Sequence, residues 1–292
     1  METGELIKSI SIRVVLYGAI LFLIFLWIFS GVLLNAYRPK DTGSPAAFNI
    51  PFEKITFPAK DKVTVNGWWV EGKTKGKCVI LCHGLGADKA DMLNYIPLLH
   101  QKGYSVLAFD FRGHGESKEK HTSLGYNEVN DLLAAVEYAK EKGAKQLGVL
   151  GRSMGAAVSI RTAEICPDIK AVIADSSFAK LTDMIRSYSN KFYHLPYYPL
   201  VPLAVFTAKI RSGFKYETVN PVESAARMRT PLLLIHGLAD GNIPPENSQK
   251  IFDAALGPKK IILVPGAGHI ESFSKDMKNY SKEVVDFFGK YL

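Results

Sequence analysis

The chain has 292 residues, 47% of them hydrophobic and 22% charged, and its formal net charge is +8. This composition excludes a disordered chain and a polytopic membrane protein, and the length suits one large α/β domain or two small domains. The lysines are dispersed and form no basic patch interleaved with aromatic residues, so we expect no nucleic-acid partner. Two explanations of the charge remain, solubility and contact with anionic lipid headgroups.

The first predicted element is a helix over residues 14–36. Val14 to Leu34 form an uncharged run rich in Leu, Ile, Phe and Val. At the rise of a helix, about 21 residues match the hydrocarbon thickness of a bilayer, so we predict a transmembrane anchor after a flank at 1–13. The basic and aromatic residues near its ends are typical of interfacial anchors: Arg13, Trp27, Tyr37, Arg38 and Lys40.

A cleaved signal peptide is the alternative for this segment. The apolar region of a signal peptide is normally shorter, and no clear A-x-A site follows Ser30. We therefore expect a single-pass membrane protein with an N-terminal anchor. The basic residues at the two ends of the run are balanced, so they do not assign the side of the membrane on which the rest of the chain lies.

A polar stalk is predicted over residues 37–48, and a folded domain over 49–292. The domain opens with two strands of a hairpin, Glu53–Phe57 and Val63–Glu71. Six apolar runs of strand length follow: Lys77–Cys82, Ser105–Asp110, Leu147–Leu150, Ala171–Ala174, Pro231–His236 and Lys260–Val264. Runs that are apolar on both faces are typical of parallel strands covered by helices.

Helical patterns alternate with these strands. They cover Lys89–Lys102, Tyr126–Lys142, Met154–Ile165, Glu246–Leu256 and Glu271–Tyr291. The alternation predicts an α/β fold with a mostly parallel, doubly wound sheet, whose sites lie beyond the carboxyl ends of the strands. An insertion at about 178–230, rich in Tyr, Phe and Pro, predicts a small helical cap over such a site, although an ordinary packing subdomain has the same composition.

The pentapeptide Gly151-Arg152-Ser153-Met154-Gly155 joins a predicted strand to a predicted helix. A G-x-S-x-G turn in this context is a nucleophile elbow, which presents a serine at a helix N-terminus. A serine nucleophile also needs a base, an acid that orients the base, and amide donors for an oxyanion. His269 and Asp240 follow later strands in the required order, and the glycine turn after Lys77–Cys82 offers the amide of Leu85 beside that of Met154.

These residues make the chain resemble an α/β-hydrolase, in particular the membrane-anchored α/β-hydrolase-domain proteins of the serine-peptidase-like, esterase and thioesterase branch. The segments that carry the resemblance run in order along the domain: His83–Gly86, Phe109–Ser117, Gly151–Gly155, Ala174–Phe178, His236–Pro244 and Gly266–His269. The resemblance implies Ser153 as nucleophile, Asp240 as acid, His269 as base, and the amides of Leu85 and Met154 as the oxyanion hole.

Other residues could share these roles. Asp175 also follows a strand and is the alternative acid, whereas His114 and His236 are expected to support the site without transferring protons. We assign substrate binding to six residues beside the serine and in the cap: His83, Gly84, Arg152, Phe178, Phe192 and Tyr197. No metal-ligand spacing or dinucleotide fingerprint appears, so we predict neither a metal nor a cofactor.

The expected function is therefore that of a membrane-anchored serine hydrolase. Its predicted substrates are carboxylic esters or thioesters of apolar acyl groups, because the cap is aromatic and an anchor precedes the domain. A serine peptidase is the alternative enzyme, since the same residues serve amides. A non-catalytic, membrane-tethered interaction protein on a hydrolase scaffold is the alternative of another class.

Overall fold

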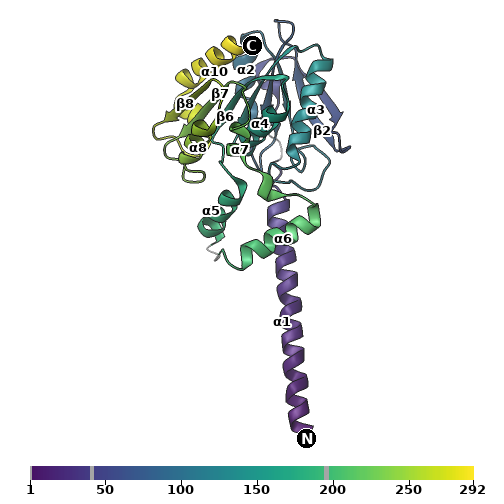
Figure 1. The fold of residues 1–292 in the computed structure, drawn as a ribbon. Helices are drawn as coiled ribbons and strands as arrows, with labels where there is room; N and C mark the ends of the chain where they lie inside the picture. Colours follow the sequence, from purple (N-terminus) through teal and green to yellow (C-terminus); the bar gives the residue numbers. More distant parts are fainter. Residues whose placement is uncertain (1, 40–42, 194–196) are drawn as a thin grey trace.

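A computed structural model describes residues 2–39, 43–193 and 197–292, with side chains from residue 4 onward and without those of residues 192 and 193. In this part of the chain eight strands form one sheet, in the order β1-β2-β4-β3-β5-β6-β7-β8 (Figure 1). Their bounds are β1 Glu53–Pro58, β2 Thr64–Val70, β3 Lys77–Cys82, β4 Ser105–Phe109, β5 Gln146–Arg152, β6 Ile169–Asp175, β7 Leu232–Gly237 and β8 Lys259–Val264. Only the pairings that involve β2 are antiparallel, which confirms the mostly parallel sheet.

Helices cover both faces of the sheet, as a doubly wound fold requires. One face packs against α3 (Glu128–Glu141), α4 (Met154–Ile165) and α8 (Glu246–Ala254). The other packs against α2 (Tyr95–Gln101) and α10 (Met277–Tyr291). The winding reverses at β3, because β4 lies on one side of it and β5 on the other. The loops that follow β3 and β5 therefore diverge and leave a crevice at the carboxyl edge of the sheet.

Two predicted helices are interrupted. Lys89–Lys102 contains a 3-10 helix, η2 (Lys89–Met92), and then α2, because Pro97 is tolerated only in the first turn of a helix. Glu271–Tyr291 contains α9 (Ser272–Lys275) and α10, and the carboxylate of Asp276 between them accepts a hydrogen bond from the amide of Asn279 at 3.3 Å. This contact caps the start of α10 and fixes the break.

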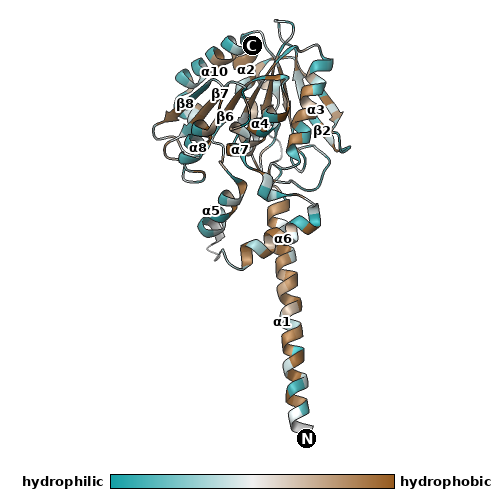
Figure 2. Cartoon of the chain, viewed as in Figure 1, coloured by the Kyte–Doolittle hydropathy of each residue, from teal (hydrophilic) through white to brown (hydrophobic). Residues whose placement is uncertain are grey.

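The N-terminal helix α1 covers Glu2–Leu34, so it begins well before residue 14 and ends before residue 36. The charged residues ahead of the apolar run are compatible with a helix and do not end it. Figure 2 shows α1 as a long apolar rod that leaves one end of the domain. The part from Gly4 to Leu34 is long and apolar enough to cross a membrane, and only 6% of its most apolar stretch is buried.

The insertion between β6 and β7 divides into two parts. The helices α5 (Leu181–Tyr193) and α6 (Leu200–Ser212) stand away from the sheet at the end of the domain from which α1 leaves (Figure 1). After η3 (Tyr216–Thr218), helix α7 (Pro221–Ala225) packs against α4 and α8 and so belongs to the main helical layer. The cap is therefore smaller than the predicted insertion.

The predicted stalk is held against the domain where the structure describes it. It contains η1 (Pro45–Phe48), in which Pro45 is buried. Arg38, predicted to be an interfacial anchor, donates hydrogen bonds to the carbonyl oxygens of Gly113 and Ser117, at 3.1 and 3.2 Å. Lys40 lies outside the described residues. The junction between α1 and the sheet is consequently fixed by the domain.

Candidate active site

Ser153 lies at the turn from β5 into α4, with φ of 53° and ψ of −115°. This backbone conformation is strained for a residue with a side chain, and close packing of the flanking glycines holds it. A Cβ added at Gly155 would lie 2.2 Å from the carbonyl oxygen of Cys82, and one added at Gly151 would lie 2.3 Å from the carbonyl oxygen of Gly155. Both glycines are therefore required for β3, β5 and α4 to approach closely enough to form the elbow.

The two other members of the predicted triad reach Ser153 from the loops after β7 and β8. The Nε2 atom of His269 lies 3.0 Å from the hydroxyl oxygen of Ser153, and its Nδ1 atom lies 2.7 Å from a carboxylate oxygen of Asp240. An ionised carboxylate only accepts hydrogen bonds, so the ring proton is on Nδ1 and Nε2 is free to accept the serine proton. The structure thus brings the three residues into the arrangement of a nucleophile, a base and an orienting acid.

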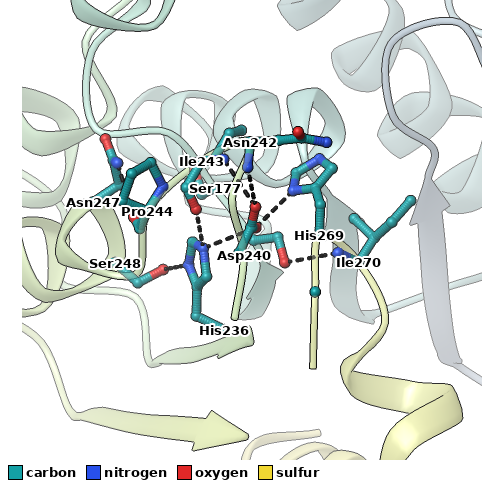
Figure 3. Close-up of polar contacts among 12 residues, drawn as sticks. Ser177, His236, Asp240, Asn242, Ile243, Pro244, Asn247, Ser248, His269 and Ile270 are labelled. Atoms are coloured by element: carbon teal, nitrogen blue, oxygen red, sulfur yellow. Dashed lines mark hydrogen bonds and ion pairs between the residues drawn. The ribbon is translucent and has the colours of Figure 1, made fainter. Parts of the chain in front are cut away.

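Asp240 is buried, yet its surroundings favour the charged form. Burial opposes ionisation, but hydrogen bonds from His236, from His269 and from the amide of Ile243 outweigh it and hold the pKa of Asp240 well below its usual range. The Oδ1 atom accepts from the amides of Asn242 and Ile243, both at 2.9 Å. Figure 3 shows the carboxylate between the two histidines.

His236 acts on Asp240 and does not reach Ser153. Its Nε2 atom lies 2.7 Å from the carbonyl oxygen of Ile243 and 3.2 Å from the Asp240 carboxylate, so Nε2 carries the proton. Its Nδ1 atom then accepts from the hydroxyl of Ser248 at 2.6 Å. The sequence analysis did not assign Ser248 to the site, and its position on α8 gave no signal of this contact.

The predicted oxyanion donors lie on either side of the serine. Met154 is the first residue of α4, where backbone amides have no partner within the helix. Leu85 lies in the turn after β3, and both residues border the same cavity as Ser153. A Cβ at Gly84 would lie 3.3 Å from the Cβ of Ser153, so this glycine lets the β3 turn approach the nucleophile. These positions suit two amides that converge on a developing oxyanion.

Two predicted substrate ligands are engaged elsewhere. His83 is fully buried, donates from Nδ1 to the carbonyl oxygen of Gly84 at 2.7 Å and accepts from the amide of Phe111 at 3.0 Å. Burial, with the nearby His114 ring, lowers the pKa of His83 to about 3, so it stays neutral. Arg152 turns away from Ser153 and joins the Asp91 carboxylate, at 2.8 Å, to the carbonyl oxygen of Ile270, at 2.6 Å. Arg152 therefore positions the loop that carries His269.

Ser153 opens into an apolar cavity of about 150 Å³. Among the predicted cap residues, Phe178 lines this cavity, whereas Tyr197 packs in the adjoining apolar cluster with the Arg186 guanidinium 5.1 Å from its ring. The side chain of Phe192 lies outside the described residues. Five more lining residues belong to the predicted cap insertion: Met184, Ile185, Tyr188, Ser189 and Val201. The other walls come from residues that the sequence did not indicate: Phe29, Val32, Leu33 and Leu124.

The alternative acid, Asp175, has other partners. Its carboxylate accepts hydrogen bonds from the hydroxyls of Tyr280 and Ser176, both at 3.0 Å, and the structure describes no contact between it and His269. Asp175 therefore braces the end of β6. Within the described residues, no group of three or more His, Cys, Asp or Glu side chains is arranged to hold a metal ion.

Known proteins resemble this chain in sequence and in fold. The profile of the prolyl oligopeptidase family matches residues 91–292. The chain belongs to the prolyl oligopeptidase family. Among the similar proteins is the uncharacterized protein YqkD of Bacillus subtilis (strain 168). It is 31% identical over 241 residues, which cover 80% of this chain and 79% of YqkD.

Two further comparisons, one of sequence and one of structure, cover most of this chain. The uncharacterized protein YfhR of Salmonella typhi is 26% identical over 311 residues and aligns with 100% of this chain and 98% of its own. The Pyrococcus furiosus esterase PF2001 superimposes with a TM-score of 0.76 at 27% identity, covering 89% of this chain and 98% of the esterase. The predicted α/β-hydrolase fold is confirmed, and the protein is a hydrolase of this fold.

Proposed function

We propose that this chain is a membrane-anchored serine hydrolase that cleaves carboxylic esters or thioesters of apolar acyl groups. One observation carries the proposal: Ser153, within 3.0 Å of the His269 imidazole, borders an apolar cavity. A nucleophile next to a base gives the means to cleave an acyl bond, and an apolar cavity gives a place for the acyl group.

The reaction follows from the positions of the side chains. His269 takes the proton of Ser153 as the hydroxyl oxygen attacks the acyl carbonyl, and the amides of Leu85 and Met154 stabilise the oxyanion. The imidazolium then protonates the leaving group, so the alcohol or thiol departs and an acyl-enzyme remains. Water, deprotonated by His269, cleaves this intermediate and restores the serine. Asp240 keeps the imidazole in the required tautomer and stabilises its positive charge.

The walls of the cavity favour an apolar acyl group. The described residues around it carry no charged side chain. A cavity of about 150 Å³ with apolar walls is large enough to bind a molecule such as benzene, so it can hold several carbons of an acyl chain. We therefore expect esters of medium or long acyl chains to be better substrates than acetates.

A serine peptidase is the second candidate, because the chain belongs to the prolyl oligopeptidase family. The acidic residues of the insertion that could receive a peptide amino terminus have other partners. Glu217 pairs with Lys209 at 2.7 Å, and Glu223 accepts from the side-chain amide of Asn220 at 2.6 Å. Neither lines the cavity. These contacts favour esters and thioesters over peptides.

The exposed apolar surface of α1 supports the membrane anchor. Large side chains such as Leu16, Leu21 and Leu23 are more than half exposed along this helix. An exposed apolar surface of this extent is unfavourable in water and is typical of a segment that lies in a bilayer.

A fluorophosphonate probe on membranes that contain the protein tests the proposal. Such a probe reacts with an activated serine, so we expect labelling of the wild-type chain and none of Ser153→Ala. A panel of acyl esters, acyl thioesters and peptides, in which release of each leaving group is measured, then separates the two enzyme candidates. Equal labelling of both proteins would contradict the serine hydrolase and favour a non-catalytic scaffold.

A further inference from the structure

The end of the predicted membrane anchor is part of the cavity next to the nucleophile. Phe29, Val32 and Leu33 of α1 line the same cavity as Ser153. Their spacing of three and four residues places them on one face of the helix. That face continues into the exposed surface of α1, since Val32 is 48% exposed and so lies at the rim of the cavity.

The domain holds this end of α1 in place. The carbonyl oxygen of Leu34, the last residue of the helix, accepts a hydrogen bond from the amide of Thr122 at 2.9 Å. On the cap side, Arg211 of α6 lies 4.3 Å from the Trp27 ring and donates to the hydroxyl of Ser30 at 2.6 Å. These contacts come from two sides, so α1 is a fixed wall of the cavity and not a flexible tether.

The length of the apolar run sets the depth of this wall in a bilayer. The uncharged run 14–34 spans about 31 Å as a helix, which is close to the ~30 Å of a hydrocarbon core. The part that precedes Phe29 spans only about 22 Å. The helix therefore crosses the whole core only if the turns that line the cavity lie at the boundary between hydrocarbon and headgroups.

Helix α6 independently indicates that this end of the domain lies at the same depth in the bilayer. Its buried face, which includes Ala204 and Ala208, packs toward the protein. Its opposite face exposes Leu203, Phe206 and Ile210, at 36%, 58% and 69%. A helix that is apolar on both faces but covered on one requires an apolar environment on the other. Figure 2 places α6 across α1 at the end of the domain from which α1 leaves.

We infer that the acyl chain of a membrane lipid ester or thioester enters the cavity from the adjoining leaflet, along a wall formed by Phe29, Val32 and Leu33. The anchor is thus part of the acyl-binding site. This inference rests on the proposed function and names the source of its substrate. It implies that side chains of α1 determine which acyl-chain lengths the enzyme prefers. A helix that served only as an anchor would have no such effect.

Substitutions at Val32 test the wall in the full-length protein in detergent micelles. The measurement is the ratio of kcat/KM for p-nitrophenyl decanoate to that for p-nitrophenyl acetate, with active enzyme counted by fluorophosphonate labelling. Val32→Trp fills the rim, so we expect the ratio to fall at least tenfold. Val32→Ala enlarges it and should move the preference toward longer acyl chains. Ile28→Trp is the matched control, because Ile28 lies one turn away and does not line the cavity.

A fluorescent label on α6 tests whether the cavity lies at the depth of the acyl chains in the bilayer. All three cysteines are buried, so a cysteine introduced at the surface can be labelled selectively. We expect a nitrobenzoxadiazole label on Phe206→Cys, in phosphatidylcholine vesicles, to be quenched by brominated acyl chains. The same label on Glu141→Cys, near the opposite edge of the sheet, should not be quenched.

Each outcome bears on a separate statement. An unchanged ratio in Val32→Trp would overturn the wall, and an unquenched label at position 206 would overturn entry from the leaflet. In both cases labelling of Ser153 would leave the proposed function standing. Absence of labelling in the wild-type protein would instead contradict the proposed function itself.

Discussion

The two oxygens of the Asp240 carboxylate have different partners. Oδ1 accepts from two backbone amides of its own loop, and Oδ2 faces His269 and His236. The loop therefore fixes the side chain through Oδ1, while Oδ2 is directed at the imidazole. Because the amides hold the carboxylate independently of the histidines, its position does not depend on the protonation of His269.

Asp240→Asn is expected to lower kcat by about 10⁴. The asparagine oxygen can accept from the amides of Asn242 and Ile243, so its NH2 group faces His269 and stabilises the tautomer that cannot accept the serine proton. Steady-state hydrolysis of an activated ester measures the loss. Asp175→Asn is the control and should stay within about tenfold of wild type, since Asp175 braces β6; the reverse order would make Asp175 the acid.

The difference in thermal stability between Asp240→Asn and wild type should depend on pH. Folding lowers the pKa of Asp240, so the ionised carboxylate stabilises the folded state above its ordinary pKa of about 4. This contribution is lost as the pH falls toward the lower pKa of the folded state. Asp240→Asn should therefore unfold at a lower temperature than wild type at neutral pH, and the gap should narrow below about pH 4. A gap independent of pH would mean that folding does not shift the pKa of Asp240.

At the scale of elements, the elbow depends on how closely α4 approaches β3. Gly155→Ala would place a methyl group against the carbonyl oxygens of Cys82 and His83, at 2.2 and 2.5 Å, which are backbone atoms and cannot move separately. We expect a loss of about 1–3 kcal/mol in the free energy of unfolding, together with slower probe labelling of Ser153. Denaturant titration measures the first and labelling kinetics the second.

A glycine in an open position provides the comparison. A Cβ added at Gly289 in α10 would have no heavy atom within 4 Å. Gly289→Ala should therefore stabilise the protein by up to about 1 kcal/mol through helix propensity alone, without any effect on labelling. Stabilisation of similar size at both positions would show that helix propensity, and not the contact with β3, governs Gly155.

An element could be predicted from the sequence where its structural role restricts which residue types can fill it. The strands and α4 could be predicted because a parallel sheet covered on both faces demands continuous apolar runs between glycine turns. The triad could be predicted because Ser, Asp and His each follow a strand. Arg152 was predicted to bind substrate from its place beside the serine, which did not reveal that its side chain turns toward Asp91.

The cavity wall could not be predicted from the sequence. Phe29, Val32 and Leu33 belong to a run whose apolar character is already explained by its length and position. No polar or small residue marks the face that meets the cavity. Contact between residues so distant in the chain depends on the angle at which α1 leaves the domain, and hydrophobic periodicity carries no information on that angle.

For the whole molecule, the proposed wall favours an anchor over a signal peptide. Cleavage after Ser30 would separate Phe29 from Val32 and Leu33, and it would break the contacts of Trp27 and Ser30 with Arg211. The cavity would then open to water along the side that α1 covers. A protein that needs this wall for acyl binding has to keep its N-terminal helix.

We therefore expect the mature protein to retain residues 1–34. The membrane fraction, washed with alkaline carbonate to remove peripheral proteins, should contain a chain whose mass includes residues 1–34, together with peptides from the N-terminal flank. Intact-mass and peptide mass spectrometry check both. A chain that begins near residue 31, recovered in the soluble fraction with full activity toward decanoate, would contradict the anchor and the wall together. Loss of decanoate preference in such a chain, with acetate hydrolysis kept, would show instead that α1 binds the acyl group even where cleavage is possible.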